Sequence, residues 1–475
     1  MSKKKNLLFV FADQWRADAM GFAHEDPVIT PNMDAFCADA TYCDHAFSTF
    51  PVCTAHRASL ITGRYPLSMG IFTNCKTGLS MRLEDDEIGV GQMLKQAGYE
   101  TAYIGKWHLD EPEQNHCPEP ASGARNWDAF TPPGVRRHGF DYWYSYGTYD
   151  VHMKPHYWRD TPEMICVDEW SPRHETNKAI EYLDDVWTKE NPFALYISWN
   201  PPHSLYDQVP QEYLDLYPEV KFKDNVSLEH IHHHTGEMMD YTPEQMNLIT
   251  RQYYAAVSGL DDQFGRLVNY LKEKGLYDDT VIVLSADHGD MMGSHGLMGK
   301  YVWYEESIHI PFVVRVPGNE KHHCRTCIGS QDMTPTVLGL LGVPVADTVE
   351  GEDCSVYLTK DGEDLEKVSY LCACPGRDIF LKNFADAGED PKRFGWRGVR
   401  TQDYTYVIEL GYDVKPHPAR YLYCTAADPH QMHPLALDVP ENRRTAQKLE
   451  ADVIAWMQQQ KDGFAENWLK EAESL

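Results

Sequence analysis

The stretch TVIVLSADHGD, residues 280–290, has an apolar half followed by a charged half. Residues 280–285 are mostly β-branched or apolar, which is the composition of a buried strand, and Asp287 and His288 follow at its end. In open α/β sheets, ligand sites gather at the carboxyl ends of the strands. The stretch therefore predicts one strand of such a sheet, with polar groups of a functional site at its end.

A long helix is predicted just before this strand. Thr242 is a favourable N-cap, Pro243 suits the first helical position, and Gln245 completes a capping box. Apolar side chains then recur on one face until Gly275 ends the helix. Other segments with strand composition alternate with helical patterns, which favours an α/β sheet with both faces covered: residues 7–12, 101–105, 193–199 and 311–316.

The chain changes character near residues 345–367, where it becomes acidic and contains glycine. We interpret this segment as the crossing between a catalytic α/β domain, residues 1–360, and a C-terminal subdomain, residues 361–475. The smaller unit is predicted from its strand patterns at 396–407 and 420–424 and from a last helix near 441–460.

An irregular insert is predicted between residues 110 and 170. This part has little periodicity but many Pro, His, Trp and Tyr residues. Long irregular segments in compact enzymes are usually functional loops.

Composition excludes several classes of protein. Hydrophobic content is 42%, which is a globular value, and 43 basic against 72 acidic residues give a formal charge of −29. Such a chain repels nucleic acid and anionic membranes, so neither is expected as a partner. The apolar run after the basic start ends at Asp13, too early for a secretory signal, and no run approaches the ~20 apolar residues of a membrane span. We expect a cytoplasmic protein.

Twelve cysteines in a reducing compartment are expected to be mostly free and buried. Cys324 and Cys327 have a zinc-like spacing, but no second pair follows at a fitting distance, so a structural role is expected. The histidine-rich stretch at residues 230–234 is interpreted as a polar surface loop.

Polar side chains end four of the apolar strand patterns. Each pair alone is more often explained by a cap or turn. Cys53 and Arg57 in PVCTAHR add a fifth polar segment, and the whole set is hard to explain by caps. The pairs are Asp13 and Gln14, Lys106 and His108, Asn200 and His203, and Asp287 and His288.

The residue types in these segments fit one another. Asp13, Gln14, Asp287 and His288 offer mostly oxygen ligands. They suit a hard divalent cation such as Ca²⁺ or Mg²⁺, and the histidine also allows Mn²⁺. The fixed positive charges are those of Arg57, Lys106 and Lys300. A metal and three cations in one site imply an anionic oxyester substrate.

Several of these segments resemble those of a known protein family. CTAHRASLITGRYP, residues 53–66, resembles the signature of formylglycine-dependent (type I) sulfatases of the alkaline phosphatase superfamily. GKWHL, NPPH, SADHGDMMGSHGLMGK and YEESIHIPF resemble further sulfatase segments in the same order, and the likeness extends from about Asn6 to Ala436. It implies an alkaline-phosphatase-like α/β fold, with a large mixed sheet between helices and a smaller C-terminal antiparallel sheet plus helix.

The resemblance also implies a role for Cys53. In sulfatases the signature cysteine is oxidised to formylglycine (3-oxoalanine), an aldehyde that hydrates to a geminal diol. One hydroxyl of the diol attacks sulfur, and the other then loses its proton and expels sulfate. A serine would leave a sulfate ester that is slow to hydrolyse. Without the resemblance, Cys53 could be a core thiol, a metal ligand, a redox group or a nucleophile.

Roles of other residues follow by matching position. The metal ligands would be Asp13, Gln14, Cys53 (as residue 53), Asp287 and His288, and Ca²⁺ is the expected cation. Arg57 and Lys106 would hold the diol, and His108 would orient or deprotonate it. His203 and Lys300 would bind sulfate and protonate the leaving oxygen.

Two positions depart from the family pattern. Ala55 stands where many members have proline, which resembles the variant served by the oxygen-independent radical maturase, so that enzyme is an expected partner and an anaerobic bacterium an expected source. His309 stands where arginine is common, and no role is assigned to it.

The expected function is hydrolysis of sulfate monoesters of a small sulfated sugar or an aryl sulfate. Aromatic residues within 137–158 could stack on such a ring, although a structural role for most of them is at least as plausible. One alternative is a phosphonate monoester or phosphodiester hydrolase of the same superfamily. Another is a non-catalytic binder of sulfated ligands in which Cys53 is never matured.

Overall fold

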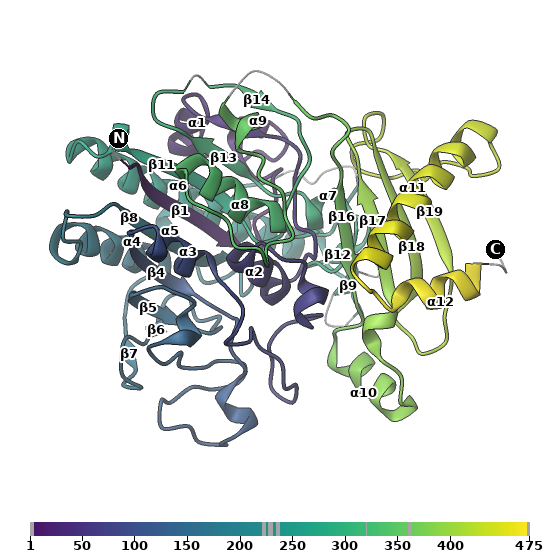
Figure 1. Ribbon diagram of the computed structural model, residues 1–475, viewed down its shortest axis with the longest axis horizontal. Helices are drawn as coiled ribbons and strands as arrows, with labels where there is room; N and C mark the ends of the chain where they lie inside the picture. The colour runs from purple at the N-terminus through teal and green to yellow at the C-terminus, as the bar shows by residue number, and fades with distance from the viewer. Residues whose placement is uncertain are drawn as a thin grey trace.

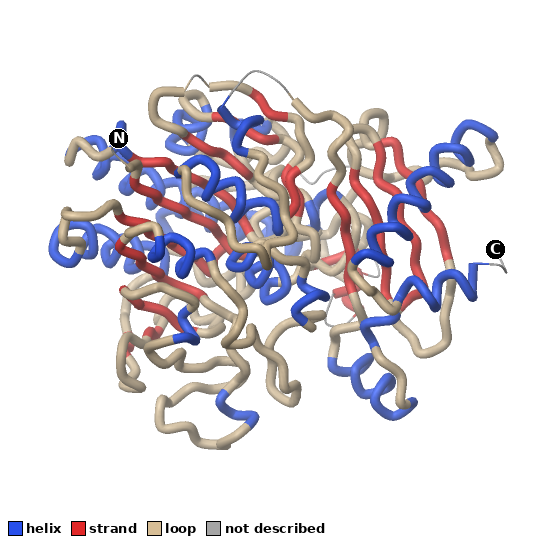
Figure 2. The backbone as a smooth tube through the Cα atoms, viewed as in Figure 1, coloured by secondary structure: helices blue, strands red, loops and turns tan. Residues whose placement is uncertain are grey.

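The computed structural model describes residues 4–220, 225–226, 231–233, 238–319, 321–359 and 363–472, without the side chains of 231–233 and 238–239. The side chains of the histidine-rich stretch 230–234 lie outside this part of the chain. Figures 1 and 2 show two sheets lying side by side, each with its own helices.

The main sheet has eight strands and is mixed, as predicted. Five neighbouring strands, from β11 to β5, run parallel. Of the three strands on the other side, β13 and β2 each pair antiparallel with their inner neighbour, and β14 pairs parallel with β2. In spatial order the strands are β14 (His323–Cys324), β2 (Thr41–Cys43), β13 (Phe312–Arg315), β11 (Thr280–Ala286), β1 (Asn6–Asp13), β8 (Phe193–Pro202), β4 (Glu100–Lys106) and β5 (Tyr142–Tyr146).

The central strands form where the sequence predicts them because they are buried on both faces. β1, β8 and β11 are buried along their whole length, so they need an unbroken apolar run rather than an alternation. Two groups of helices sandwich the sheet: α1 (Pro31–Cys37), α4 (Ser171–Glu181), α5 (Gln211–Leu214) and α6 pack together, as do α2 (Cys53–Thr62), α3 (Val90–Gln96) and α8 (Ser330–Leu341).

Helix α6 (Pro243–Glu273) confirms the predicted capping box. The Thr242 hydroxyl accepts from the Gln245 amide at 3.2 Å, and the Gln245 side chain accepts from the Thr242 amide at 2.9 Å. Gly275 follows with φ of +68°, a conformation that favours glycine. The apolar stripe of this helix faces the core.

The C-terminal sheet is antiparallel, with strands β16 (Ser369–Ala373), β17 (Gly395–Arg400), β18 (Tyr404–Gly411) and β19 (Ala419–Cys424). Helix α11 (Pro440–Gln459) packs on it, followed by α12 (Phe464–Glu471). The strand pattern predicted over 396–407 divides into two strands at a turn, where the Thr401 amide donates to the Tyr404 carbonyl at 2.9 Å. The boundary at residues 360 and 361 stays a prediction.

Hydrogen bonds join the C-terminal sheet to two loops of the larger unit. The Cys372 amide donates to the Thr49 carbonyl at 2.8 Å, and the Trp396 indole donates to the Tyr301 carbonyl at 2.9 Å. The C-terminal unit therefore has fixed contacts with the loop before α2 and with the residue that follows Lys300.

The segment predicted as an irregular insert contains more structure than expected. Strand β5 lies at the edge of the main sheet, and all five of its residues, YWYSY, are buried. Its short aromatic run gave no periodic signal. The other short elements are β3 (Ala46–Phe47), β6 (His156–Tyr157), β7 (Ile165–Cys166), β9 (Ile231–His233), β10 (Met238–Met239), β12 (Leu297–Met298), β15 (Ile328–Gly329), α7 (Glu305–Ile308), α9 (Ser355–Thr359) and α10 (Asp378–Ala387).

Among the described residues, no helix combines the length and apolar character needed to cross a membrane. All twelve cysteines are free, and Cys324 and Cys327 are buried in the core.

Candidate active site

Cys53 lies at the first position of helix α2 and is 1% exposed. Its sulfur is 3.1 Å from Lys300 Nζ, 3.3 Å from His288 Nε2 and 3.6 Å from Asp13 Oδ1. A helix N-terminus favours negative charge because its first amides are unpaired. The fold thus delivers the side chain of residue 53 into a cluster of charged groups from three other segments.

Fixed cations surround this cluster. Lys106 Nζ lies 2.7 Å from Asp13 Oδ2, and Arg57 contacts both Asp13 at 3.1 Å and Asp287 at 3.0 Å. Burial raises the pKa of the Cys53 thiol, but Lys300 and Lys106 outweigh burial and hold that pKa well below its ordinary value. An anion is therefore stable at the position of the residue 53 side chain.

The residues predicted to bind metal come together. Asp13, Cys53, Asp287 and His288 are all buried and offer ligand atoms within 4.8 Å of one another. Burial and the neighbouring Asp13 carboxylate raise the pKa of Asp287 and outweigh the opposing effect of Arg57. A donor set of two carboxylates, an imidazole and residue 53 fits one divalent cation.

Gln14 adjoins the same cluster. Its backbone amide donates to Asp287 at 3.0 Å, and its side-chain oxygen accepts from Lys300 Nζ at 2.9 Å. Its side-chain nitrogen donates to Asp290 and to the Tyr206 hydroxyl, so the amide is held in one orientation. The amide oxygen thus faces the charged groups around residue 53.

His108 has one ring nitrogen that faces Cys53. Its Nε2 donates to the Cys75 carbonyl at 3.0 Å, while its Nδ1 is buried and has no other partner among the described residues. Burial lowers the pKa of His108 and outweighs the interaction with Cys53, which raises that pKa, so the ring is neutral at pH 7. Since Nε2 carries the proton, Nδ1 presents a lone pair that can accept one.

His203 and Asp150 form an ion pair at the edge of the site. Burial disfavours the charged imidazole, but the Asp150 carboxylate, 3.3 Å away, outweighs burial and raises the pKa of His203 to about 9. Asn200 joins this pair to the centre, because it accepts from Lys106 Nζ at 3.0 Å and donates to Asp150 at 3.1 Å. Asp150 was not predicted as a site residue, because it lies in the irregular insert and follows no predicted strand.

Gly105, the residue before Lys106, lies where strand β4 packs closely against the backbone of β8. A Cβ atom at Gly105 would lie 2.1 Å from the Ser198 carbonyl oxygen, and φ there is +102°. We therefore expect Gly105→Ala to lower the free energy of unfolding by about 3 kcal/mol or more, in urea denaturation.

Gly70→Ala is the matched control for this substitution. Gly70 also has a positive φ, +74°, but no atom lies within 4 Å of an added Cβ. Its expected cost is about 1 kcal/mol, from the left-handed backbone alone. Equal losses in the two variants would contradict the close approach at Gly105.

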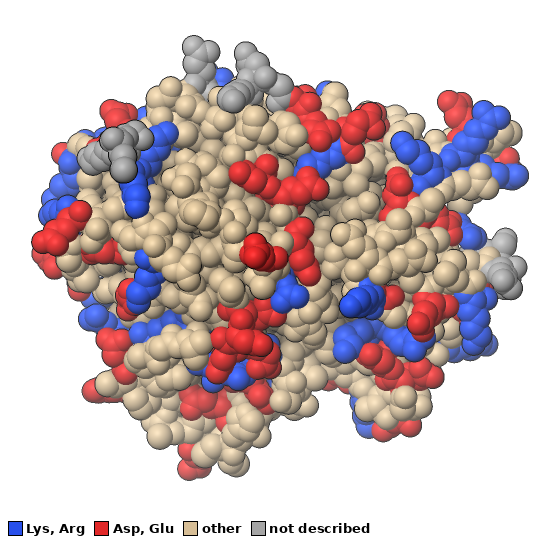
Figure 3. All heavy atoms as spheres, viewed as in Figure 1, with Lys and Arg blue, Asp and Glu red and all other residues tan. Residues whose placement is uncertain are grey.

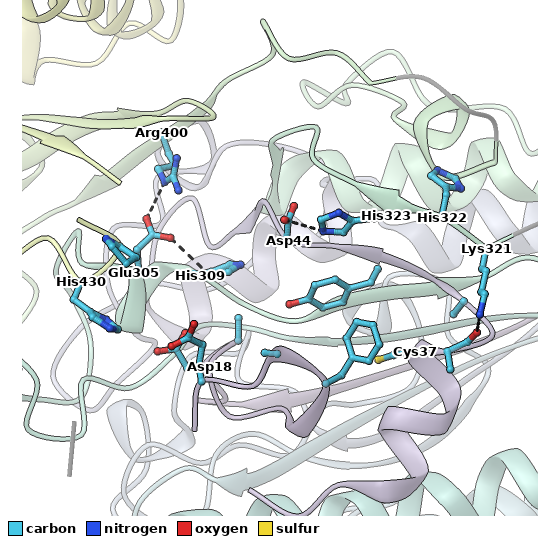
Figure 4. Close-up of a pocket in the computed structure, with 18 residues that line it drawn as sticks. Asp18, Cys37, Asp44, Glu305, His309, Lys321, His322, His323, Arg400 and His430 are labelled. Carbon is cyan, nitrogen blue, oxygen red and sulfur yellow. Dashed lines mark hydrogen bonds and ion pairs between the residues drawn. The ribbon is translucent and has the colours of Figure 1, made fainter. Parts of the chain in front are cut away.

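A separate cavity of about 820 Å³ is lined in part by Tyr42 of β2 and His323 of β14 (Figure 4). His309, which received no role in the sequence analysis, lies here, 3.8 Å from Glu305, which also pairs with Arg400 at 2.8 Å. None of the lining residues is among the described contacts of Cys53, so the cavity is separate from the candidate active site.

Comparison with known proteins finds sulfatases along the whole chain. The family models described as Sulfatase and as N-sulphoglucosamine sulphohydrolase, C-terminal, match residues 5–343 and 293–459. An endo-4-O-sulfatase of Bacteroides thetaiotaomicron is 32% identical over 476 residues, covering 94% of this chain and 90% of the relative. A solved structure, described under the metabolism of multiple glycosaminoglycans by the same organism, has a TM-score of 0.85 at 30% identity and covers 99% of each chain.

The phosphonate hydrolase alternative is more distant. The crystal structure of a phosphonate monoester hydrolase of Agrobacterium radiobacter has a TM-score of 0.75, with 96% of each chain covered, but only 19% identity. Likeness at this level shows the shared fold alone.

Proposed function

The chain belongs to the sulfatase family of sulfuric ester hydrolases, and from this premise we propose that it cleaves sulfate monoesters through a formylglycine derived from Cys53. One observation carries the proposal: the sulfur of Cys53 lies at a helix N-terminus, within 3.6 Å of Lys300, His288 and Asp13. When formed, the hydrated aldehyde supplies a hydroxyl that attacks sulfur and a second hydroxyl whose deprotonation releases sulfate.

Three groups act directly on the diol and on its charge. Nδ1 of His108 accepts a proton from a residue 53 hydroxyl, because this nitrogen is unprotonated and otherwise unpaired. Arg57 and Lys106 are fixed by Asp13, so their charge neutralises sulfate without rearrangement.

Two groups serve the leaving oxygen. His203 is protonated at neutral pH because Asp150 raises its pKa, and it can donate a proton to the departing alcohol. Lys300, whose Nζ contacts both Cys53 and the side-chain oxygen of Gln14, binds sulfate and can also protonate the leaving oxygen.

We propose that Asp13, Gln14, Asp287, His288 and residue 53 hold one divalent cation, with Ca²⁺ as the expected ion. The oxygen-rich donor set supports a hard cation. When bound, the cation supplies positive charge that polarises the sulfate ester.

Maturation is part of the proposal. Ala55 in CTAHR supports processing of Cys53 by the oxygen-independent radical maturase, and this in turn supports a cytoplasmic site of maturation and action.

We propose a small sulfated sugar as the substrate, with aryl sulfates as surrogates. The solved relative described under the metabolism of multiple glycosaminoglycans, at 30% identity, supports a sugar. The formal charge of −29 supports a small ligand over a long polyanion. On the face shown in Figure 3, basic side chains are interspersed with acidic ones instead of forming a continuous basic surface.

A turnover screen of matured protein with sulfated sugars, aryl sulfates and phenyl phosphonates tests the function. We expect sulfates to be the faster substrates. Phosphonate turnover above that of every sulfate would overturn the assignment.

The His203–Asp150 pair predicts a pH dependence. Because the pKa of His203 is raised to about 9, the acid is present below that pH and activity should fall as the pH rises through 9. Asp150→Asn removes the charge that raises this pKa, so the basic limb of the kcat profile should move to lower pH.

His203→Ala gives the matching loss of function. We expect a reduction on the order of 10²–10⁴-fold with sulfated sugars and a much smaller one with activated aryl sulfates, whose leaving groups need no proton. Equal losses with both substrates would remove His203 from the role of acid.

A further inference from the structure

We propose that Trp127 and Arg377 form a subsite for the leaving group, which binds a sugar ring that carries a second anionic group, either a carboxylate or another sulfate. The inference rests on the proposed function, because it places the subsite beside the candidate nucleophile. It adds a contribution from the C-terminal unit, which the sequence analysis did not assign to the site.

The loop before α10 is anchored beside the Cys53 site. The Gly376 carbonyl accepts from Lys76 Nζ at 2.6 Å and from the Thr73 hydroxyl at 3.0 Å. The Thr73 hydroxyl also lies 3.2 Å from the hydroxyl of Tyr301, the residue that follows Lys300. Since Lys300 contacts Cys53, this chain of contacts holds the backbone next to Arg377 close to the candidate nucleophile.

Trp127 offers an aromatic face beside a proposed catalytic group. Its ring stacks on the His108 ring at 6.5 Å between centroids and 30° between planes, yet the residue is 38% exposed. Aromatic side chains of this kind bind the apolar faces of rings while their edges stay in water. A sugar with its sulfate at residue 53 would meet this indole next to His108.

Lys76 links the two residues of the subsite. Its Nζ lies 6.0 Å from the centre of the Trp127 ring, and the same ammonium group binds the Gly376 carbonyl. Lys76 is itself 3% exposed and pairs with Asp378, so it sets the position of Trp127 and Arg377 while Arg377 meets the ligand.

Arg377 supplies a half-buried positive charge at this place. Its guanidinium lies 4.3 Å from the centre of the Phe380 ring and interacts with the hydroxyls of Tyr301 and Tyr412. Burial raises the pKa of both tyrosines, so both are neutral at pH 7 and neither cancels the charge of the guanidinium. Guanidinium groups bind carboxylate and sulfate oxygens in bidentate geometry.

The cavity shown in Figure 4 shares no residue with the described contacts of Cys53. A leaving group whose sulfate lies at residue 53 is therefore not assigned to this cavity.

The test compares kcat/KM of matured, metal-loaded protein on three substrates that share one sulfated hexosamine. The first is the neutral monosulfated sugar, the second its disaccharide with a uronate, and the third a disulfated hexosamine. Arg377→Gln should lower the ratio of anionic to neutral kcat/KM by about 10- to 100-fold, mainly through KM, since one charge-assisted contact is lost. Arg377→Lys should restore part of the ratio.

Arg393→Gln is the matched control, because Arg393 is another half-buried arginine of the same unit and pairs with Glu466. It should leave the ratio unchanged. Trp127→Ala should raise KM for all three sugars by up to about tenfold.

The possible results distinguish failure of the subsite from failure of the proposed function. If the wild-type protein hydrolyses sulfates but Arg377→Gln keeps the wild-type ratio for both anionic sugars, the subsite is wrong and the proposed function stands. If the wild-type protein hydrolyses no sulfate, the proposed function itself fails. A loss confined to the uronate or to the disulfated sugar identifies which anion Arg377 binds.

Discussion

Cys53→Ala is expected to remove nearly all sulfate ester turnover, by at least about 10⁴-fold, while the protein stays folded. Alanine cannot be converted to an aldehyde, and so no hydroxyl is available to attack sulfur. The substitution removes one sulfur atom from a buried position at the start of α2, which changes the packing little. Steady-state turnover with an aryl sulfate and thermal unfolding measure the two effects.

Cys53→Ser separates the nucleophile from its second hydroxyl. A serine can accept sulfate but has no geminal hydroxyl to expel it, so the variant should give at most a single-turnover burst. Steady-state turnover by either variant near the wild-type rate would contradict a role for residue 53.

Asp13→Asn and Asp287→Asn are expected to abolish metal binding and activity together. Each substitution removes a charged oxygen donor from a fully buried set of ligands. Asp13→Asn should also destabilise the fold by about 3–5 kcal/mol, because it leaves Arg57 and Lys106 buried without their shared partner. Elemental analysis, turnover and urea denaturation measure the three effects.

Asp332→Asn is the control for loss of a buried, paired carboxylate. Asp332 is 1% exposed and pairs with Lys367 at 3.1 Å, outside the candidate metal site. Its variant should lose stability but keep the metal. Full metal occupancy in Asp287→Asn would refute the ligand assignment.

The sequence predicted the parts of the fold whose signal is local. β1, β8 and β11 follow from unbroken apolar runs, and α6 follows from its capping box and apolar stripe. β5 escaped prediction because its five residues are buried on an edge beside β4, a long-range environment that its short aromatic run does not encode.

The candidate site likewise contains residues that local sequence signals predict and residues that they do not. Residues at strand ends, such as Asp13, Lys106 and Asp287, could be predicted because the ends of parallel strands meet at one edge of a sheet. Asp150, Trp127 and Arg377 lie in loops with no such rule, and only the folded chain brings them to the cluster.

The central claim is tested most directly by peptide mass spectrometry of active protein produced with a formylglycine-generating maturase. We predict that the peptide containing residue 53 has lost sulfur and carries an aldehyde that reacts with hydrazide probes, in proportion to specific activity. An unmodified Cys53 thiol in fully active enzyme would contradict the account.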